Sequence, residues 1–178
     1  MNRRIFIGIK VRPEIYPKID SWRKRYRNLP LRWISNENLH ITLIPPWYED
    51  GKKVRVKVKE IGREVRGFRG FSLMFDKVGF GPTLRNPRLI WAEGEVPEEL
   101  IVLKSKLENI LQKKPEKREY KLHLTLASIK KRDYKMSSNQ KINDKVFWKQ
   151  TVSSFCLFES ILSAKGAEYK VIKEFKIT

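Results

Sequence analysis

The stretch Leu39-His40-Ile41-Thr42-Leu43 recurs later in the chain as Leu122-His123-Leu124-Thr125-Leu126, and this pair organises the rest of the sequence. Apolar and polar residues alternate in both copies, which is the pattern of a β-strand with one packed face and one open face. In each copy, the histidine and the threonine therefore point to the same side. The sequence contains two histidines, and both occur in this setting.

A similar order of elements precedes each copy. Residues 4–11 and 88–94 are rich in β-branched and aromatic residues and predict strands. A proline follows each strand, and apolar residues at helical spacing follow each proline. The histidine lies 27 residues after Pro13 (13 to 40) and 26 after Pro97 (97 to 123). We therefore expect a single domain over residues 1–178, built from two pseudo-symmetric, interleaved lobes with repeat units of about 4–43 and 88–126.

The segments around the first histidine strand give three further expectations. The first helix begins near Tyr16, because Pro17 is tolerated only in a first turn. Pro45-Pro46 ends the histidine strand. Residues 52–69 fit both strand and helix spacing, and the longer window favours a helix with a basic exposed face. That face is most simply solvated, with a nucleic-acid patch as the alternative.

The second half of the chain completes the expected elements. Residues 71–78 predict a strand, and the Gly/Pro/Asn-rich segment 79–87 predicts a loop. Residues 130–144 are basic and polar and predict a surface loop. Residues 152–162 and 168–177 predict a hairpin across Lys165-Gly166-Ala167 that extends one of the sheets.

Composition indicates a folded, basic protein. The chain has 39 basic and 20 acidic residues, a net charge of +19, and 40% of its residues are hydrophobic. The charge favours a polyanionic partner such as nucleic acid, although a solvated basic surface is the simpler alternative. The single Cys156 fits a reducing compartment and a buried position. No signal peptide or membrane-spanning segment is predicted, so we expect a cytoplasmic protein.

Two imidazoles facing a common cleft suit in-line displacement at phosphorus. One histidine would take a proton from the attacking hydroxyl while the other protonates the leaving oxygen, with no metal and no cofactor. Thr42 and Thr125 could donate hydrogen bonds to the phosphate oxygens. A lone histidine beside a threonine is more often a satisfied core residue, and it is the matched pair that favours catalysis. Two histidines without an acidic or cysteine cluster supply too few ligands for a metal, and no nucleophile-elbow pattern supports a Ser-His-Asp triad.

These motifs resemble those of the 2H phosphoesterases, and within them the RNA 2′,3′-cyclic phosphodiesterases, also called 2′-5′ RNA ligases. The resemblance covers nearly the whole chain and rests on the two His-x-Thr-Leu motifs, the opening Arg4-Ile5-Phe6-Ile7-Gly8-Ile9 and Pro87-Arg88-Leu89-Ile90-Trp91-Ala92. It implies an α+β, bilobal, pseudo-two-fold fold, in which two antiparallel sheets line a central basic cleft and helices lie outside. It also implies opening of a terminal 2′,3′-cyclic phosphate by water to leave a 2′-phosphate, and the reverse formation of a 2′-5′ linkage.

The resemblance also implies residue roles. His40 would be the proton donor and His123 the proton acceptor, although the sequence itself leaves that order open. Family members often have arginine where this chain has Ser128, and Lys130 would share that strand face and could replace the charge if the strand continued. Further candidates for substrate binding, by stacking on bases, are Trp33 and Trp47 together with Tyr48, Phe80 and Trp91, and most of these rings are expected to lie in the core.

The implied partners are RNA ends or cyclic nucleotides, bound by a monomer that does not associate with a membrane. Two alternatives stay open. One is an RNA-end-binding module with little turnover. The other is an enzyme for another small cyclic phosphate or for an oligonucleotide end.

Overall fold

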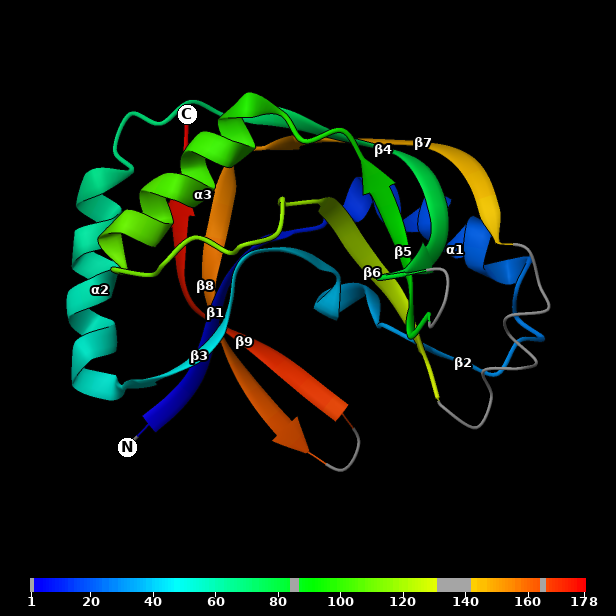
Figure 1. Cartoon of the computed structure of the whole chain (residues 1–178), viewed down its shortest axis with the longest axis horizontal. Helices are drawn as coiled ribbons and strands as arrows, with labels where there is room; N and C mark the ends of the chain where they lie inside the picture. The colour runs from blue at the N-terminus through cyan, green and yellow to red at the C-terminus, as the bar shows by residue number, and fades with distance from the viewer. Residues whose placement is uncertain (1, 84–86, 131–141, 164–165) are drawn as a thin grey trace.

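The computed structural model describes residues 2–83, 87–130, 142–163 and 166–178. Within these ranges, the strands form two antiparallel sheets (Figure 1). Sheet A has the order β3-β1-β8-β9 and sheet B the order β2-β6-β5-β4-β7. Sheet A contains β1 (Asn2–Lys10), β3 (His40–Asp50), β8 (Ser154–Ser163) and β9 (Gly166–Lys176). Sheet B contains β2 (Leu31–Trp33), β4 (Phe71–Gly81), β5 (Leu89–Gly94), β6 (Leu122–Ile129) and β7 (Asn143–Val152).

The α-helices of the described chain lie outside the sheets (Figure 1) and are α1 (Tyr16–Lys24), α2 (Gly51–Glu64) and α3 (Glu98–Ile110). α2 and α3 lie side by side next to sheet A. α1 lies against sheet B, where Trp22 meets the rings of Trp33 and Trp148 edge to face. The expected α+β fold with two antiparallel sheets and outer helices is therefore confirmed.

The order of strand, helix and histidine strand occurs twice. β1 is followed by α1 and pairs with β3, and β5 is followed by α3 and pairs with β6. Each helix packs away from the strand that precedes it: α1 follows β1 of sheet A but lies against sheet B, and α3 follows β5 of sheet B but contacts β3 of sheet A. The division of residues 1–178 into interleaved repeat units stays a prediction.

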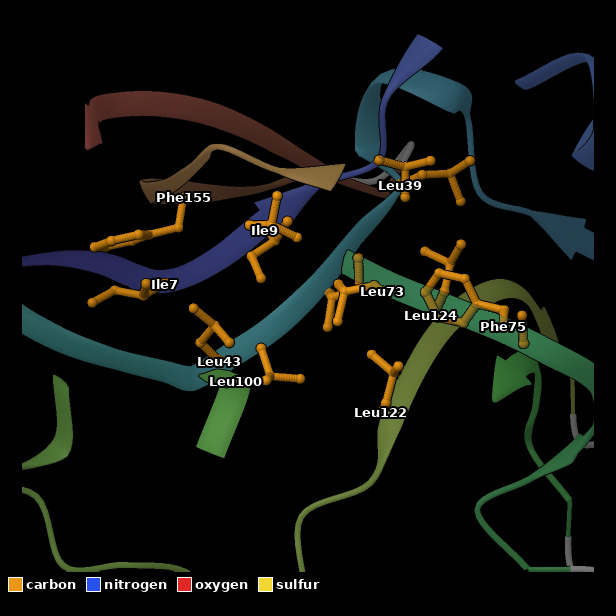
Figure 2. Close-up of a cluster of buried hydrophobic side chains, with 14 of the residues drawn as sticks. Ile7, Ile9, Leu39, Leu43, Leu73, Phe75, Leu100, Leu122, Leu124 and Phe155 are labelled. Carbon is orange, nitrogen blue, oxygen red and sulfur yellow. The ribbon is translucent and has the colours of Figure 1, made fainter. Parts of the chain in front are cut away.

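A shared hydrophobic core joins the two sheets (Figure 2). Leu39 and Leu43 from the first motif and Leu122 and Leu124 from the second are at most 2% exposed. Burying a leucine side chain contributes about 1.5–3 kcal/mol. Since neighbouring residues of a strand point to opposite faces, these leucines turn the intervening histidines and threonines away from the core.

The prediction that Pro45-Pro46 ends the first histidine strand was wrong. β3 continues through both prolines to Asp50 and pairs with β1 as far as Asn2. β3 is the edge strand of sheet A, so one side of its backbone has no sheet partner and proline is tolerated there. The register of β1 and β3 also shifts between Ile5 and Ile7, which absorbs the prolines in an irregular pairing.

Two predicted loops were also partly wrong. β4 continues to Gly81, although residues 79–87 were expected to form a loop. β7 begins at Asn143, within the expected loop 130–144, of which residues 131–141 lie outside the described part of the chain. The buried face of β7 includes the polar Gln150 between Trp148 and Val152, so the sequence of this strand does not show a regular alternation of hydrophobic and polar residues. The Gln150 side chain accepts a hydrogen bond from the backbone of Arg12 and donates one to Lys10, so the polar group is satisfied.

Four further expectations about elements and burial are confirmed. Gly51–Glu64 is a helix because Val54 and Ile61 fall on one buried face, and the Asp50 carboxylate caps its first turn by accepting from the Lys52 backbone. α1 begins at Tyr16, as predicted. β8 and β9 form an antiparallel hairpin that extends sheet A, and Lys165 lies outside the described residues. Cys156 is buried, and burial raises the pKa of its thiol to about 11.

Candidate active site

The strand register places the two motifs in matching positions. In sheet A, His40 lies directly across from Lys10, and Thr42 lies across from Gly8. In sheet B, His123 lies across from Glu93. Directly opposed residues share a face of the sheet, so each histidine and its threonine lie on one surface with these partners. Both imidazoles and both threonines are partly exposed.

Gly8 makes room beside the first imidazole. A Cβ at this position would lie 2.8 Å from the carbonyl oxygen of Ile41 and 3.5 Å from Cδ2 of His40. The first distance is too short for any side chain, so the close pairing of β1 and β3 at the histidine requires glycine.

Each imidazole is anchored by the same local hydrogen bond. Nδ1 of His40 lies 2.7 Å from the carbonyl oxygen of Asn38, and Nδ1 of His123 lies 2.9 Å from that of Lys121. A carbonyl oxygen can only accept, so Nδ1 carries the hydrogen in both rings. Nε2 is consequently the nitrogen left to exchange a proton with a bound molecule. The carbonyl acceptor is two residues before the histidine in both motifs, which makes the anchoring a property of the motif itself.

The surroundings of the two rings differ. His40 packs against Phe6 and Tyr169, with ring centroids 4.9 Å away in each case, and more distantly against Phe158. His123 packs against the ring of Trp91 at 4.7 Å. Burial lowers the pKa of His40, the Asn38 carbonyl opposes this shift, and repulsion from His123 adds to it.

The two imidazoles are therefore close enough to interact electrostatically. A direct contact also links the two motifs: the Tyr120 hydroxyl, in the segment that leads into β6, donates to the backbone oxygen of Thr42 at 2.8 Å. Figure 1 shows β3 and β6 running through the middle of the molecule between the outer helices.

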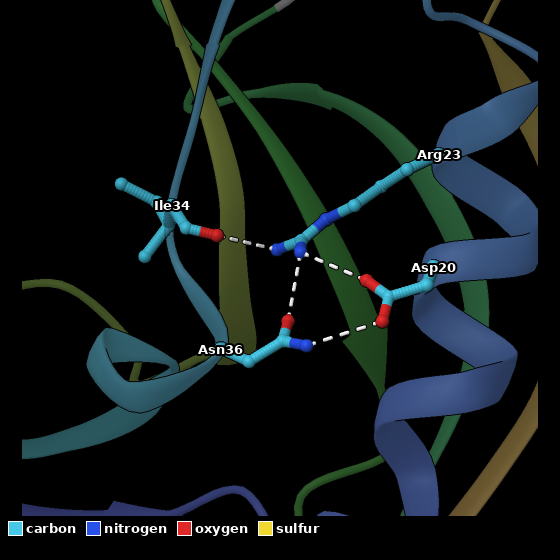
Figure 3. A network of polar contacts seen from close by, with 4 residues as sticks. All are labelled: Asp20, Arg23, Ile34 and Asn36. Atoms are coloured by element: carbon cyan, nitrogen blue, oxygen red, sulfur yellow. Dashed lines mark hydrogen bonds and ion pairs between the residues drawn. The ribbon is translucent and has the colours of Figure 1, made fainter.

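A polar network fixes the segment that precedes His40 (Figure 3). Arg23 of α1 donates to the Ile34 carbonyl at 2.7 Å and to the Asn36 side chain at 2.8 Å. Asp20 accepts from Arg23 at 3.2 Å and from Asn36 at 3.1 Å. Because this segment leads directly to Asn38, whose carbonyl anchors His40, the network ties the position of the imidazole to α1.

The two tryptophans proposed for substrate binding lie on the opposite faces of their sheets. Trp33 is paired with Ala127 and packs against Trp22, behind the surface that carries His123. Trp47 is paired with the core residue Ile5, and the Lys113 ammonium group lies 4.4 Å from the centroid of its ring. The ring contacts found for the two tryptophans include neither imidazole, and their role in substrate binding stays a prediction.

Ser128 shares a face with the second motif, whereas Lys130 does not continue the strand. β6 has an extra residue between Thr125 and Ala127 relative to β5, which turns Ser128 to the face of Thr125. β6 ends at Ile129, so the strand-face argument for Lys130, which is exposed, does not hold. Arg32 of β2 lies directly across from Ser128 and therefore presents a cation on this face.

The sequence did not reveal Arg32 or Tyr169 as neighbours of the motifs. A cavity of about 350 Å³ lies beside Tyr169, whose ring packs against His40, and is lined by residues that include Arg32, Trp33, Asn38, Ser128 and Tyr169. These residues come from three separate parts of the chain, and only the pairing of β2 with β6 and of β8 with β9 brings them together. In the sequence, the number of positions between a residue and the histidine of the same strand indicates whether both side chains point to the same face. Trp47 is an odd number of positions after His40, which places its ring on the core side.

A larger cavity of about 890 Å³ lies elsewhere, between α2 and the Arg3–Glu159 side of sheet A. Neither of these two cavities is lined by an imidazole, so we place the candidate site at the histidines on chemical grounds. Among the described residues, no group of three or more His, Cys, Asp and Glu side chains is arranged to hold a metal ion. In the same part of the chain, no helix is long and apolar enough to cross a membrane.

The fold matches those of solved structures that include LigT. Escherichia coli LigT complexed with NADP⁺ superimposes with a TM-score of 0.77 at 24% identity, over 100% of this chain and 99% of that one. TT0787 of Thermus thermophilus gives a TM-score of 0.78 at 20% identity, over 98% of this chain and 97% of that one. These likenesses establish the shared two-sheet architecture.

The chain belongs to the 2′-5′ RNA ligase superfamily, whose family model matches residues 11–161. A relative from Archaeoglobus fulgidus, named RNA 2′,3′-cyclic phosphodiesterase, is 29% identical over 97% of this chain and 99% of its own length. A protein of the same name from Thermotoga maritima is 28% identical over 96% of this chain and 94% of its own length. The family expected from the motifs is thus confirmed.

Proposed function

We propose that this chain hydrolyses the terminal 2′,3′-cyclic phosphate of RNA to a 2′-phosphate by acid–base catalysis with two histidines. The family membership and the curated relatives named RNA 2′,3′-cyclic phosphodiesterase support the reaction class. The observation that carries the mechanism is the matched anchoring of the two imidazoles, in which a backbone carbonyl holds each Nδ1 and leaves Nε2 to react. The two rings supply both a donor and an acceptor, so the mechanism needs no metal.

In the proposed reaction, a water oxygen attacks phosphorus while Nε2 of His123 takes a proton from that water. The bond between phosphorus and O3′ breaks, and Nε2 of protonated His40 gives its proton to O3′. Thr42 and Thr125 donate hydrogen bonds to the non-bridging oxygens as charge builds on them. When an RNA 5′-hydroxyl replaces water as the attacking group, His123 takes the proton of that hydroxyl, O3′ leaves in the same way, and a 2′-5′ linkage forms.

The lowered pKa of His40 suits the donor role, because a protonated imidazole with a lower pKa gives up its proton more readily. The anionic phosphate of a bound substrate favours the protonated form and so offsets the effect of burial. Arg32, across from Ser128, adds positive charge on the face of the second motif.

The first test measures cleavage of a short RNA that ends in a 2′,3′-cyclic phosphate, with the product identified by phosphorus NMR. We expect His40→Ala and His123→Ala each to lower the rate by about 10²- to 10⁴-fold, with the melting temperature retained and with EDTA without effect. Thr42→Val and Thr125→Val should also lower the cleavage rate. Thr151→Val, which replaces an exposed threonine on β7, should leave the rate unchanged. Full activity in either histidine variant would refute the mechanism.

A second test separates donor from acceptor. An activated p-nitrophenyl phosphodiester has a leaving group that departs as a stable anion and needs no proton. On this substrate His40→Ala should recover much of its lost activity, whereas His123→Ala should stay slow because water still needs a base. Recovery in His123→Ala and not in His40→Ala would make His123 the proton donor and His40 the proton acceptor.

A further inference from the structure

The surface of sheet A that carries His40 continues along β1 beyond the imidazole. Arg4, Phe6, Gly8 and Lys10 alternate with core residues and share one face of β1. Phe6 contacts His40, which fixes this as the face of the candidate site. From Gly8, which lies across from Thr42, to Arg4 is four residues, or about 13 Å of extended strand. That length is well above the axial spacing of about 3.4 Å between phosphates along one strand of a duplex, so this face is long enough for more than one nucleotide.

Arg4 is held on this face by a neutral partner. Its Nη1 donates to the hydroxyl of Ser160 at 2.5 Å, and Ser160 is only 5% exposed. The Arg4 charge also acts on the hydroxyl of Tyr169, whose ring packs against His40. None of the ion pairs found among the described residues includes Arg4. Arg4 thus presents an uncompensated positive charge beside the candidate site.

The neighbouring residue Arg3 is the opposite case. It points to the other face of sheet A, where its guanidinium bonds both carboxylate oxygens of Glu159. Glu49 lies across from Arg3 and shares that other face. The Glu159 carboxylate therefore neutralises Arg3, whereas Arg4 keeps its charge.

Tyr48 completes this surface. It lies directly across from Arg4 on β3, so its ring is on the same face, and it is 68% exposed. An exposed aromatic ring next to an uncompensated guanidinium is the combination that binds single-stranded nucleic acid, through base stacking and phosphate contact. Phe6 and Tyr169 lie on the same face between Arg4 and His40, and both rings pack against His40, so the surface continues to the candidate site.

We infer that Arg4, Tyr48 and Ser160 form a subsite for the nucleotides that precede the reacting end of a single-stranded RNA. Arg4 binds a backbone phosphate while Ser160 holds the guanidinium in place, and a base stacks on Tyr48. The inference rests on the proposed function and extends it, because it makes an oligonucleotide end, and not a free cyclic mononucleotide, the preferred substrate class.

The test compares kcat/KM for a hexanucleotide that ends in a 2′,3′-cyclic phosphate with kcat/KM for a cyclic mononucleotide. The ratio should fall about tenfold in Arg4→Gln and in Tyr48→Ala, since a phosphate contact or a stacked base each has an effect of this order. Arg4→Lys should retain part of the ratio because it keeps the charge without the fork. Arg3→Gln, on the opposite face, should keep the wild-type ratio. Because Tyr48 is exposed, its variant keeps the test valid even where Arg4→Gln unfolds.

Direct binding separates this inference from the proposed function. Fluorescence anisotropy with a hexanucleotide that ends in an unreactive 3′-phosphate should show about tenfold weaker binding for Arg4→Gln and Tyr48→Ala. If the wild type turns over no substrate but shows this dependence, the subsite stands and the proposed function fails. Suppose instead that the wild type is active, and that the two variants either change neither the ratio nor the binding or lower kcat/KM equally for both substrates. The subsite is then refuted and the proposed function stands.

Discussion

At the scale of single residues, the backbone carbonyls that anchor the imidazoles matter most. They lie two residues before each histidine, so the strand conformation that turns the ring outward also supplies its hydrogen-bond acceptor. The same motif therefore sets the direction of the ring and its tautomer. What differs between the two histidines is the aromatic packing, which is denser around His40.

The packing around His40 predicts a measurable pH dependence. Because burial lowers its pKa, the His40 ring in the free protein should titrate below about pH 6.5 in an NMR experiment, with His123→Ala used to assign the two imidazole signals. Between the unfolded and the lowered folded pKa, the unfolded chain binds more protons, so His40 makes stability fall as the pH drops below about 6.5. A folded His40 that titrates above this value would contradict the packing argument.

At the scale of elements, the relative placement of β3 and β6 depends on contacts outside the strands themselves. The network of Arg23, Asp20 and Asn36 holds the approach to β3 against α1. The Tyr120 hydroxyl holds the approach to β6 against Thr42. Burial raises the pKa of Tyr120, so the phenol stays protonated and keeps donating this bond.

This role of Tyr120 can be tested with a matched pair of variants. Tyr120→Phe and Tyr16→Phe each remove one hydroxyl that donates to a backbone carbonyl, and each should cost about 0.5–1.5 kcal/mol of stability. Only Tyr120→Phe should lower kcat, because the Tyr16 hydroxyl bonds to Val11, which lies outside both motifs. Equal kcat values in the two variants, measured on the cyclic-phosphate RNA, would show that Tyr120 only stabilises the fold.

At the scale of the whole molecule, the net charge of +19 bears on how a polyanion approaches. Much of the charge lies away from the candidate site, for example on α2, which packs on the other face of sheet A. Such charges accelerate encounter with RNA without specifying where it binds. In the proposed function, the local surface around Arg4 and the two histidines then determines where the RNA binds.

Salt dependence measures how many of these charges contact the substrate. We expect kcat/KM for a cyclic-phosphate oligonucleotide to fall with salt with a log–log slope of about 0.7 for each phosphate contacted. For a cyclic mononucleotide the slope should be shallower, because fewer phosphates are bound. Identical slopes for the two substrates would mean that the basic surface makes no specific contact beyond the reacting group.

The sequence by itself determined the features that depend on local periodicity. Alternation around Leu39 and Leu122 predicted strands with histidine and threonine on one face, and helical spacing predicted α1, α2 and α3, because burial of one face acts on neighbouring residues. The repeated order of elements predicted two similar lobes, and the resemblance to the 2H phosphoesterases implied the two-sheet fold. Local signals failed at Pro45-Pro46, where the edge position of β3 made proline tolerable, and at Gln150, whose polar side chain is satisfied by a distant backbone.

Only the tertiary structure decided which residues surround the histidines. Tyr169 reaches His40 from the last hairpin, Arg32 lies across from Ser128, and Tyr48 lies across from Arg4. These neighbours depend on strand order and on shifts of register, such as the extra residue in β6 that turns Ser128 outward. A shift of one residue moves a side chain to the other face of a sheet, and the pairing of distant strands sets that shift.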